Sequence, residues 1–212
     1  MIVTLIYKEM LNTITLPSKK EGQFWLGTEQ EKEIISIEGN EDRWILKSNK
    51  KVSILGMNGI NEKSIELKEN AIVKVKKEDV EGLIYTEPST DDRQIFSKKI
   101  VKNELEVSIG RSVENIICYK NDFVSSVHAI LSYRNKYWLI KDNNSVNGVF
   151  VNGKREKVKD LEFGDVINIM GLKIIVCYDF LMINNPDNKV IIKPNTFEEQ
   201  PLVGIKEYLE KI

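Results

Sequence analysis

Short runs of apolar, β-branched and aromatic residues recur along the chain, separated by turn residues. The runs are rich in Val, Ile, Thr, Trp and Tyr, and the residues between them include Gly, Asn, Asp and Pro. Because the first group favours strands and the second favours turns, each run is predicted to be a strand. The predicted strands cover residues 2–7, 23–26, 34–37, 44–47, 71–75, 104–109, 129–133, 137–141 and 173–177. Strands so short and numerous predict an all-β chain built from β-sandwiches.

The second feature of the pattern is an internal repeat. Trp44-Ile45-Leu46-Lys47 recurs as Trp138-Leu139-Ile140-Lys141, a shift of 94 positions (138 − 44). The same shift relates three further pairs of landmarks: Asn58-Gly59 and Asn152-Gly153, Leu67 and Leu161, and residues 72–75 and 166–169. One shift that serves four landmarks predicts two sandwiches of the same kind.

The repeat and the turn-rich stretches divide the chain into four parts. We expect a first domain over residues 1–86, a linker over 87–92, a second domain over 93–183 and a connecting tail over 184–212. The linker is polar, holds one proline and has no periodicity. The tail is predicted to end in a short amphipathic helix, whose apolar face is formed by Leu202, Ile205, Leu209 and Ile212.

The second copy of the repeat carries additional residues and a string of polar landmarks. Trp25-Leu26-Gly27 matches Ser108-Ile109-Gly110 at a shift of 83, so the second copy has 11 extra residues (94 − 83) before its Trp strand. The landmarks are, in order, Gly110-Arg111, Ser125-Ser126-Val127-His128, Asn147-Gly148, Asn152-Gly153 and residues 161–167. This string resembles the signature of the forkhead-associated (FHA) domain. The resemblance implies a sandwich of two twisted sheets, with the signature residues on loops at one end and phosphothreonine peptides as typical ligands.

The residue types suit such a ligand. A threonine phosphate carries about −1.5 to −2 charges and three acceptor oxygens, so its receptor needs a fixed positive charge and several converging donors. Arg111 supplies a planar fork that donates two hydrogen bonds at once, and the hydroxyls of Ser125 and Ser126 add neutral donors. By resemblance, Arg111 and Ser125 bind the phosphate, Ser126 is a further contact residue, and Asn147 holds the peptide backbone.

Other signature residues are predicted to be structural. We expect Gly110 and Gly148 to allow tight turns with positive φ, and His128 to brace a loop. Two departures from the signature weaken the predicted pocket: Ser126 stands where a longer basic or amide side chain is common, and Val149 stands where threonine is usual. These departures favour docking without phosphate, and a surface ion pair remains the alternative role for Arg111.

The first half of the chain lacks the predicted site. It has Thr28 at the position of Arg111 and Ser53 at the position of Asn147, and the 11 missing residues are those that would carry Ser125 and His128. Its retained landmarks, Trp44, Leu67 and Ile72, are of the core type. We therefore expect a degenerate domain of the same fold that binds no phosphate.

Composition and charge exclude several other classes of function. The chain has 31 Lys and Arg residues against 32 Asp and Glu residues, so it lacks the basic excess of nucleic-acid binders. Cys118 and Cys177 lie in apolar runs, where a thiol behaves as a small core hydrophobe. The most apolar segment, 172–183, is interrupted by two charged residues and is too short to span a bilayer. No signal peptide is apparent, and we expect a cytoplasmic location without direct membrane insertion.

We also expect no catalysis, cofactor or metal. The segment 148–154 matches the spacing of a phosphate-binding P-loop, but Arg155 follows it instead of the Ser or Thr that such loops need. Ser125 and His128 lie three residues apart on one predicted loop, without the buried carboxylate that a catalytic triad uses. His128 is the single histidine, so no His or Cys/His cluster is available for zinc.

The order of the two domains and the tail carries a further resemblance. A degenerate FHA domain, a recognisable FHA domain and a connector are similar to the cytoplasmic N-terminal region of the EssC/YukB family, the coupling ATPases of type VII secretion systems. The resemblance implies a docking role for proteins of the secretion machine, with tethering to the inner face of the cell membrane in a longer chain. The alternative is a signalling adaptor that reads phosphothreonine.

Overall fold

The structure is a computed structural model that describes residues 1–7, 10–27, 35–49, 51–55, 61–88, 97–100, 105–178 and 180–194. The chain divides near residue 93 into two compact units, here called domain 1 (strands β1–β10) and domain 2 (strands β11–β22). Apart from the single 3₁₀ turn η1 (Pro186–Asn188), every regular element of the described residues is a β-strand. The all-β prediction is therefore confirmed.

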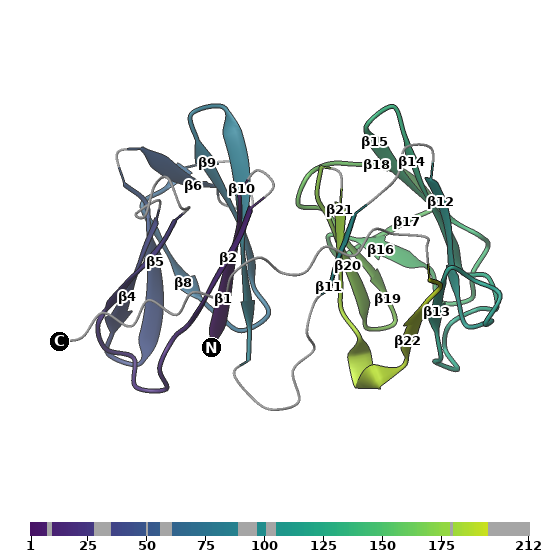
Figure 1. Ribbon diagram of the computed structural model, residues 1–212, viewed down its shortest axis with the longest axis horizontal. Helices are drawn as coiled ribbons and strands as arrows, with labels where there is room; N and C mark the ends of the chain where they lie inside the picture. Colours follow the sequence, from purple (N-terminus) through teal and green to yellow (C-terminus); the bar gives the residue numbers. More distant parts are fainter. Residues whose placement is uncertain are drawn as a thin grey trace. The chain divides into compact units, whose positions relative to one another are not determined.

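Domain 1 consists of two antiparallel sheets (Figure 1). The first sheet has the order β2-β1-β10-β9-β6-β7, and the second has the order β3-β4-β5-β8. The strands are β1 (Ile2–Tyr7), β2 (Met10–Thr15), β3 (Gln23–Leu26), β4 (Ile35–Asn40), β5 (Arg43–Lys47), β6 (Val52–Leu55), β7 (Asn61–Glu62), β8 (Ser64–Leu67), β9 (Ile72–Lys77) and β10 (Val80–Glu87). Apolar residues from both sheets form one buried cluster that includes Leu5, Ile37 and Val75.

Domain 2 repeats this two-sheet architecture, and its second sheet has six strands where that of domain 1 has four. One sheet has the order β11-β21-β20-β19-β16-β17, and the other has the order β18-β15-β14-β12-β13-β22. The strands are β11 (Ser97–Ile100), β12 (Leu105–Gly110), β13 (Ile117–Tyr119), β14 (Ala129–Arg134), β15 (Tyr137–Asp142), β16 (Val149–Val151), β17 (Lys154–Glu156), β18 (Val158–Leu161), β19 (Val166–Ile169), β20 (Leu172–Val176), β21 (Phe180–Ile183) and β22 (Val190–Ile192).

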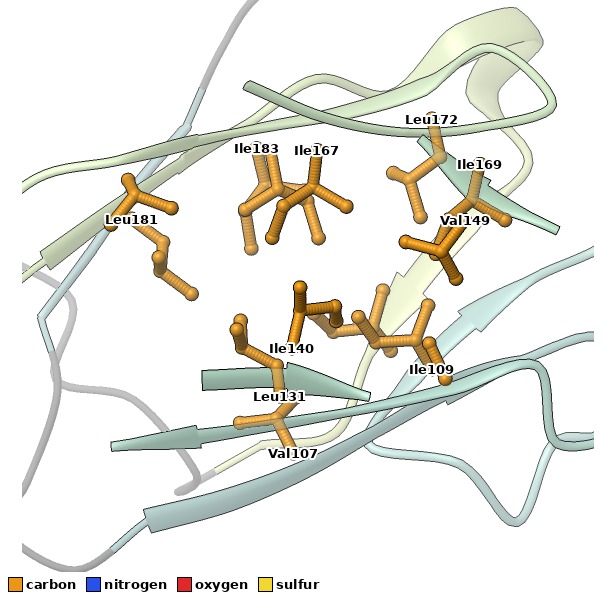
Figure 2. Packing of buried hydrophobic residues seen from close by; sticks show 14 of the residues in the cluster. Val107, Ile109, Leu131, Ile140, Val149, Ile167, Ile169, Leu172, Leu181 and Ile183 are labelled. Atoms are coloured by element: carbon orange, nitrogen blue, oxygen red, sulfur yellow. The ribbon is translucent and has the colours of Figure 1, made fainter. Parts of the chain in front are cut away.

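The core of domain 2 is formed by the alternate side chains of facing strands. Along β15, Trp138 and Ile140 are buried while Tyr137 and Lys141 are exposed, as expected for a strand with one face toward a core. Figure 2 shows Ile140 and its neighbours from one sheet meeting Ile167 and its neighbours from the other. The hydrophobic contact between the two faces holds the strand ends, and hence the loops between them, in fixed positions.

The repeat predicted from the sequence is confirmed by the register of the strands. Strands β4, β5 and β8 begin at residues 35, 43 and 64, and β14, β15 and β18 begin 94 positions later at 129, 137 and 158. Trp44 pairs with Leu67 across β5 and β8, and Trp138 pairs with Leu161 across β15 and β18. Both tryptophans are buried. The Asn58-Gly59 landmark lies outside the described residues.

The outer strands of the first sheet come from different parts of the chain in the two domains. In domain 1 the neighbour of β10 is the N-terminal strand β1. In domain 2 the neighbour of β20 is β21, which follows β20 in the chain, and β11 pairs with the far side of β21. A C-terminal strand thus takes the place that an N-terminal strand holds in domain 1.

Domain 2 extends beyond residue 183, where the sequence pattern predicted its end. Asn184 is buried, and its side chain accepts a hydrogen bond from the Lys173 backbone N–H at 2.7 Å. The chain then crosses to the other sheet, where β22 pairs antiparallel with β13. The boundary predicted at residue 183 is wrong because the polar Asn-Asn-Pro-Asp stretch, which resembles the start of a connector, leads into another strand of the domain. The predicted tail helix lies outside the described residues.

In the part of the chain that the structure describes, no helix has the length and apolar character needed to cross a membrane. Cys118 and Cys177 are both buried and are not joined in a disulfide. Cys118 lies in β13, so its side chain contributes to the packing beside the loops described next.

The first prediction concerns this core. Trp138→Ala removes a large buried side chain and the indole N–H that donates to the Cys177 carbonyl at 3.0 Å, so it should lower the free energy of unfolding by about 2–5 kcal/mol. The control is Tyr137→Ala on the same strand, whose side chain is 76% exposed and whose loss should cost less than about 0.5 kcal/mol. Chemical denaturation measures both. Equal losses for the two variants would contradict the assigned faces of β15.

Candidate functional site

Three loops lie at one end of domain 2. Loop A (residues 111–116) follows β12, loop B (120–128) precedes β14, and loop C (143–148) follows β15. Ala129, the first residue of β14, pairs with Ile109 near the end of β12 and with Asp142 at the end of β15. The three loops therefore leave the sheet at the same end, here called the loop end.

Backbone hydrogen bonds join loop A to loop B. The N–H of Arg111 donates to the Ser125 carbonyl at 2.9 Å, and the N–H of Ser112 donates to the Ser126 carbonyl at 3.1 Å. The buried amide of Asn115 donates from Nδ2 to the Ser126 carbonyl at 2.6 Å and to the Ser112 carbonyl at 2.8 Å. These bonds satisfy backbone groups that no strand pairs, and they fix the start of loop A against loop B.

The imidazole of His128 joins loop B to loop C. The Ser125 backbone N–H donates to Nδ1 of His128 at 3.1 Å, and Nε2 lies 3.1 Å from the Gly148 carbonyl oxygen. Because Nδ1 accepts and a carbonyl oxygen can only accept, Nε2 carries the proton and the ring is neutral in this arrangement. The side chain is fully buried. His128 is therefore a bridge between the loops and is not exposed to a ligand.

The two signature glycines serve different geometric needs. Gly148 has φ +82°, in the left-handed region that the sequence predicted for it. Gly110 does not have a positive φ, so that part of the prediction is wrong. A Cβ at Gly110 would lie 2.4 Å from the Ser126 carbonyl oxygen. Glycine is needed there because loop B crosses close to the backbone of β12.

Arg111, Ser125 and Asn147 are brought together at the loop end. The Arg111 side chain is exposed, and its Nε donates to the Val124 carbonyl at 3.2 Å. No other hydrogen bond or ion pair to a described residue engages its guanidinium, so both terminal nitrogens are available. Ser125 Oγ accepts from the Val146 N–H at 3.2 Å, which leaves its hydroxyl proton to donate.

Asn147 completes the group of polar side chains at this end. Its Nδ2 donates to the Phe123 carbonyl at 2.7 Å, so the amide is oriented and its Oδ1 is left to accept a hydrogen bond. A neutral acceptor beside an exposed guanidinium suits a ligand that carries both a backbone N–H and an anionic group.

The two departures from the signature have different structural meanings. Ser126 is exposed, and no bond from its hydroxyl to a described residue is present, although its carbonyl is used by loop A. Val149 is fully buried in the core cluster on β16. The valine therefore replaces threonine inside the sandwich and removes no side chain from the surface of the loops.

Exposed apolar side chains at the loop end were not predicted. Each loop carries at least one of them: Val113 on loop A, Phe123 and Val127 on loop B, and Val146 on loop C. The largest exposed fractions are 66% for Phe123 and 81% for Val146. Apolar residues at the tips of otherwise polar loops are a usable sequence signal, because exposed apolar groups gather at interaction surfaces.

Domain 1 does not reproduce the Asn147 position of the site. Ser53, which replaces Asn147, lies within strand β6 and not on a loop. Thr28, which replaces Arg111, lies outside the described residues. In domain 2 the extra residues of the second copy lie within the segment that forms loop A, β13 and loop B.

Comparisons with known proteins agree on one family. Residues 107–170 match the family model of the FHA domain. The second FHA domain of an ABC transporter from Mycobacterium tuberculosis is 35% identical over 37% of this chain and 72% of its own, with a TM-score of 0.33. EmbR of M. tuberculosis, solved with a low-affinity phosphopeptide, is 29% identical over 37% of this chain, with a TM-score of 0.31. This chain spans only 19% of the EmbR chain.

A third similar structure covers both domains. The N-terminal FHA domain of EssC, a component of the bacterial type VII secretion apparatus, is 15% identical over 95% of this chain and 99% of its own, with a TM-score of 0.39. None of the curated proteins matches this chain.

The second prediction concerns the histidine bridge. His128→Ala leaves the half-buried Ser125 N–H and the buried Gly148 carbonyl without their partner, so it should lower the free energy of unfolding by about 1–3 kcal/mol and speed hydrogen exchange at the Ser125 amide. Asn143→Ala, which removes only an exposed contact of 3.4 Å to the Val127 carbonyl, is the control. Unchanged exchange at Ser125 in His128→Ala would contradict the bridge.

Proposed function

This chain belongs to the FHA-domain family through residues 107–170, and on that premise we propose that the loop end of domain 2 docks a segment of a partner protein. The observation that carries the proposal is the exposed guanidinium of Arg111, whose terminal nitrogens have no partner among the described residues. Three loops tied by buried hydrogen bonds hold this group beside Ser125 and Asn147. A rigid surface of this kind loses little conformational entropy when a ligand binds.

The docking group that fits these side chains best is phosphothreonine. A guanidinium fork binds phosphate oxygens through two parallel, charge-assisted hydrogen bonds. The free hydroxyl protons of Ser125 and Ser126 provide further donors on loop B. The Oδ1 of Asn147 can accept a backbone N–H of an extended segment. Each polar group of a phosphorylated segment thus has a partner of the required type.

Docking without phosphate is a second candidate, favoured by the apolar loop tips. Phe123 and Val146 are largely exposed, and their backbones contact the side chains of Asn147 and Ser125. An apolar partner surface could bury them, and apolar burial stabilises a complex by about 25 cal/mol for each Å² removed from water. Paired phosphorylated and unphosphorylated peptides separate the two candidates.

Domain 1 has a different role in this proposal. We propose that residues 1–86 form a degenerate FHA-type domain without a phosphate site, that 87–92 link the two domains, and that the docking domain begins at residue 93. Domain 1 would then serve as a spacer or as a second protein-binding surface.

For the biological setting, we propose a docking role in a type VII secretion system. The order of a degenerate domain, a complete domain and a connecting tail is what supports this setting. The chain would hold components of the secretion machine on the cytoplasmic side of the membrane, with the tethering segment located in a longer protein.

The third prediction tests the docking site. Arg111→Ala removes charge-assisted hydrogen bonds worth roughly 1.5–3 kcal/mol, so it should weaken binding of phosphothreonine peptides at least about tenfold. Arg111→Lys should recover only part of the loss, because the ammonium group cannot bind in the bidentate geometry. Fluorescence anisotropy with a library of phosphothreonine peptides measures the affinities.

Arg134→Ala is the matched control for this measurement. Arg134 is an exposed arginine at the end of β14 away from the loops, so its loss should leave peptide affinity unchanged. Equal binding of the unphosphorylated twin peptides would favour the phosphate-independent candidate. Thr28→Arg in domain 1 should create no binding, because the companion loops are absent from that half of the sequence.

The fourth prediction tests the setting. In cells whose type VII secretion depends on the longer protein, Arg111→Ala should reduce export of secretion substrates while the protein itself stays at its normal level. Export assays and immunoblots of cell fractions measure both. Normal export from cells whose protein lacks residues 1–194 would contradict the docking role.

A further inference from the structure

Arg155 is a second cation beside the loop end, and the sequence signature does not use it. It lies on β17, where the register pairs it with Phe150 of β16. Directly opposite residues project from the same face of a sheet. Val149 and Val151 on β16 point into the core, so Phe150 and Arg155 lie on the outer face. The Arg155 side chain is exposed.

The guanidinium of Arg155 lies against the base of loop C. A Cβ built on Gly148 would lie 2.3 Å from Nε and 3.0 Å from one terminal nitrogen of Arg155. The arginine head therefore occupies the space that any other residue at position 148 would fill with its side chain. Gly148 thus has a second role beside its positive φ, because it lets this cation approach the residue next to Asn147.

The charge of Arg155 is not neutralised locally. No hydrogen bond or ion pair to a described residue engages its side chain, which is also true of Lys154 on the same strand. Strands β17 and β18 and the residue between them carry four cations, Lys154, Arg155, Lys157 and Lys159, against Glu156 and Asp160. Of these cations, only Lys159 has an ion pair within the described residues, to Asp165 at 3.7 Å.

We propose that Arg155 is a second anion-binding residue at the loop end, which selects partner segments that carry an acidic side chain near the phosphothreonine. The proposal rests on the docking function proposed above. The Arg155 head lies beside Gly148, the residue next to Asn147, so a segment whose backbone is held by Asn147 passes close to this second cation. A carboxylate at the position that passes Arg155 meets a guanidinium that has no partner among the described residues and that lies opposite Phe150 in the strand register.

The test is a selectivity measurement on the 212-residue chain. Phosphothreonine peptides carry a single Glu at successive positions on either side of the phosphothreonine, and each has a Gln twin. At one or two positions the Glu peptide should bind the unmodified protein about threefold to fivefold more tightly than its twin, the size expected of an exposed ion pair. Higher salt should reduce this preference.

Arg155→Gln should abolish the preference and leave the affinity for the Gln twin unchanged. Lys154→Gln, the same loss of charge one residue away, should keep the preference. Arg155→Lys should keep part of it, and thermal unfolding of all three variants should match the unmodified protein. If Arg155 had only a structural role, Arg155→Gln would weaken the binding of the Glu peptide and of its Gln twin equally.

The outcomes separate this inference from the proposed function. Binding that depends on Arg111 but shows no Glu preference at any position, or a preference that persists in Arg155→Gln, would overturn the inference alone. Binding of no phosphothreonine peptide would overturn the proposed function, and the role of Arg155 with it.

Discussion

The loop end of domain 2 depends on one buried imidazole. His128 accepts the Ser125 N–H through Nδ1 and donates to the Gly148 carbonyl through Nε2, so a single neutral ring satisfies one backbone group on each of two loops. A buried backbone group without a partner costs about 1–3 kcal/mol. A change that moves loop B away from loop C leaves the Ser125 N–H or the Gly148 carbonyl without its partner and therefore lowers the stability of the domain. The positions of the surface side chains therefore depend on the buried hydrogen bonds of His128.

This constraint explains how short loops can present a defined surface. Arg111 follows Gly110, whose missing side chain lets the Ser126 carbonyl approach β12, and Arg155 lies where Gly148 leaves room. Gly110 thus fixes the backbone at the start of loop A, and Gly148 leaves room for the exposed head of Arg155. The backbone is fixed by polar contacts between the loops, and neither the terminal nitrogens of Arg111 nor the guanidinium of Arg155 has a partner among the described residues. Such a surface offers charge to a ligand without first breaking an internal ion pair.

Much of this architecture could be predicted from the sequence because it follows from local periodicity. The shift of 94 between the Trp strands, added to the first residues of β4, β5 and β8, gives the first residues of β14, β15 and β18. The polar side chains of the loop end could be predicted because they occur in a recognisable order. Contacts between segments far apart in the chain could not be predicted. Strand β22 follows a polar stretch that resembles a connector, and its pairing with β13 is decided by tertiary contacts.

The same reason accounts for the residues that were missed at the site. Arg155 is one of several cations on β17 and β18, and only the position of its head beside Gly148 distinguishes it from Lys154. The need for glycine at position 110 was predicted, but its cause is a crossing loop and not a turn. Val149 was predicted to weaken the surface, whereas the structure places it in the core. In each case the residue type was visible and its neighbour in space was not.

The central claim is that a phosphothreonine segment binds at the loop end of domain 2 alone. The most direct measurement is a titration of the isotopically labelled chain with a binding phosphothreonine peptide, followed by two-dimensional amide NMR spectra. The account predicts that the shifted amides belong to residues 111–128 and 143–148, with domain 1 unaffected. Shifts confined to domain 1 or to the outer faces of the sheets, with the amides of Arg111, Ser125 and Asn147 unchanged, would contradict it.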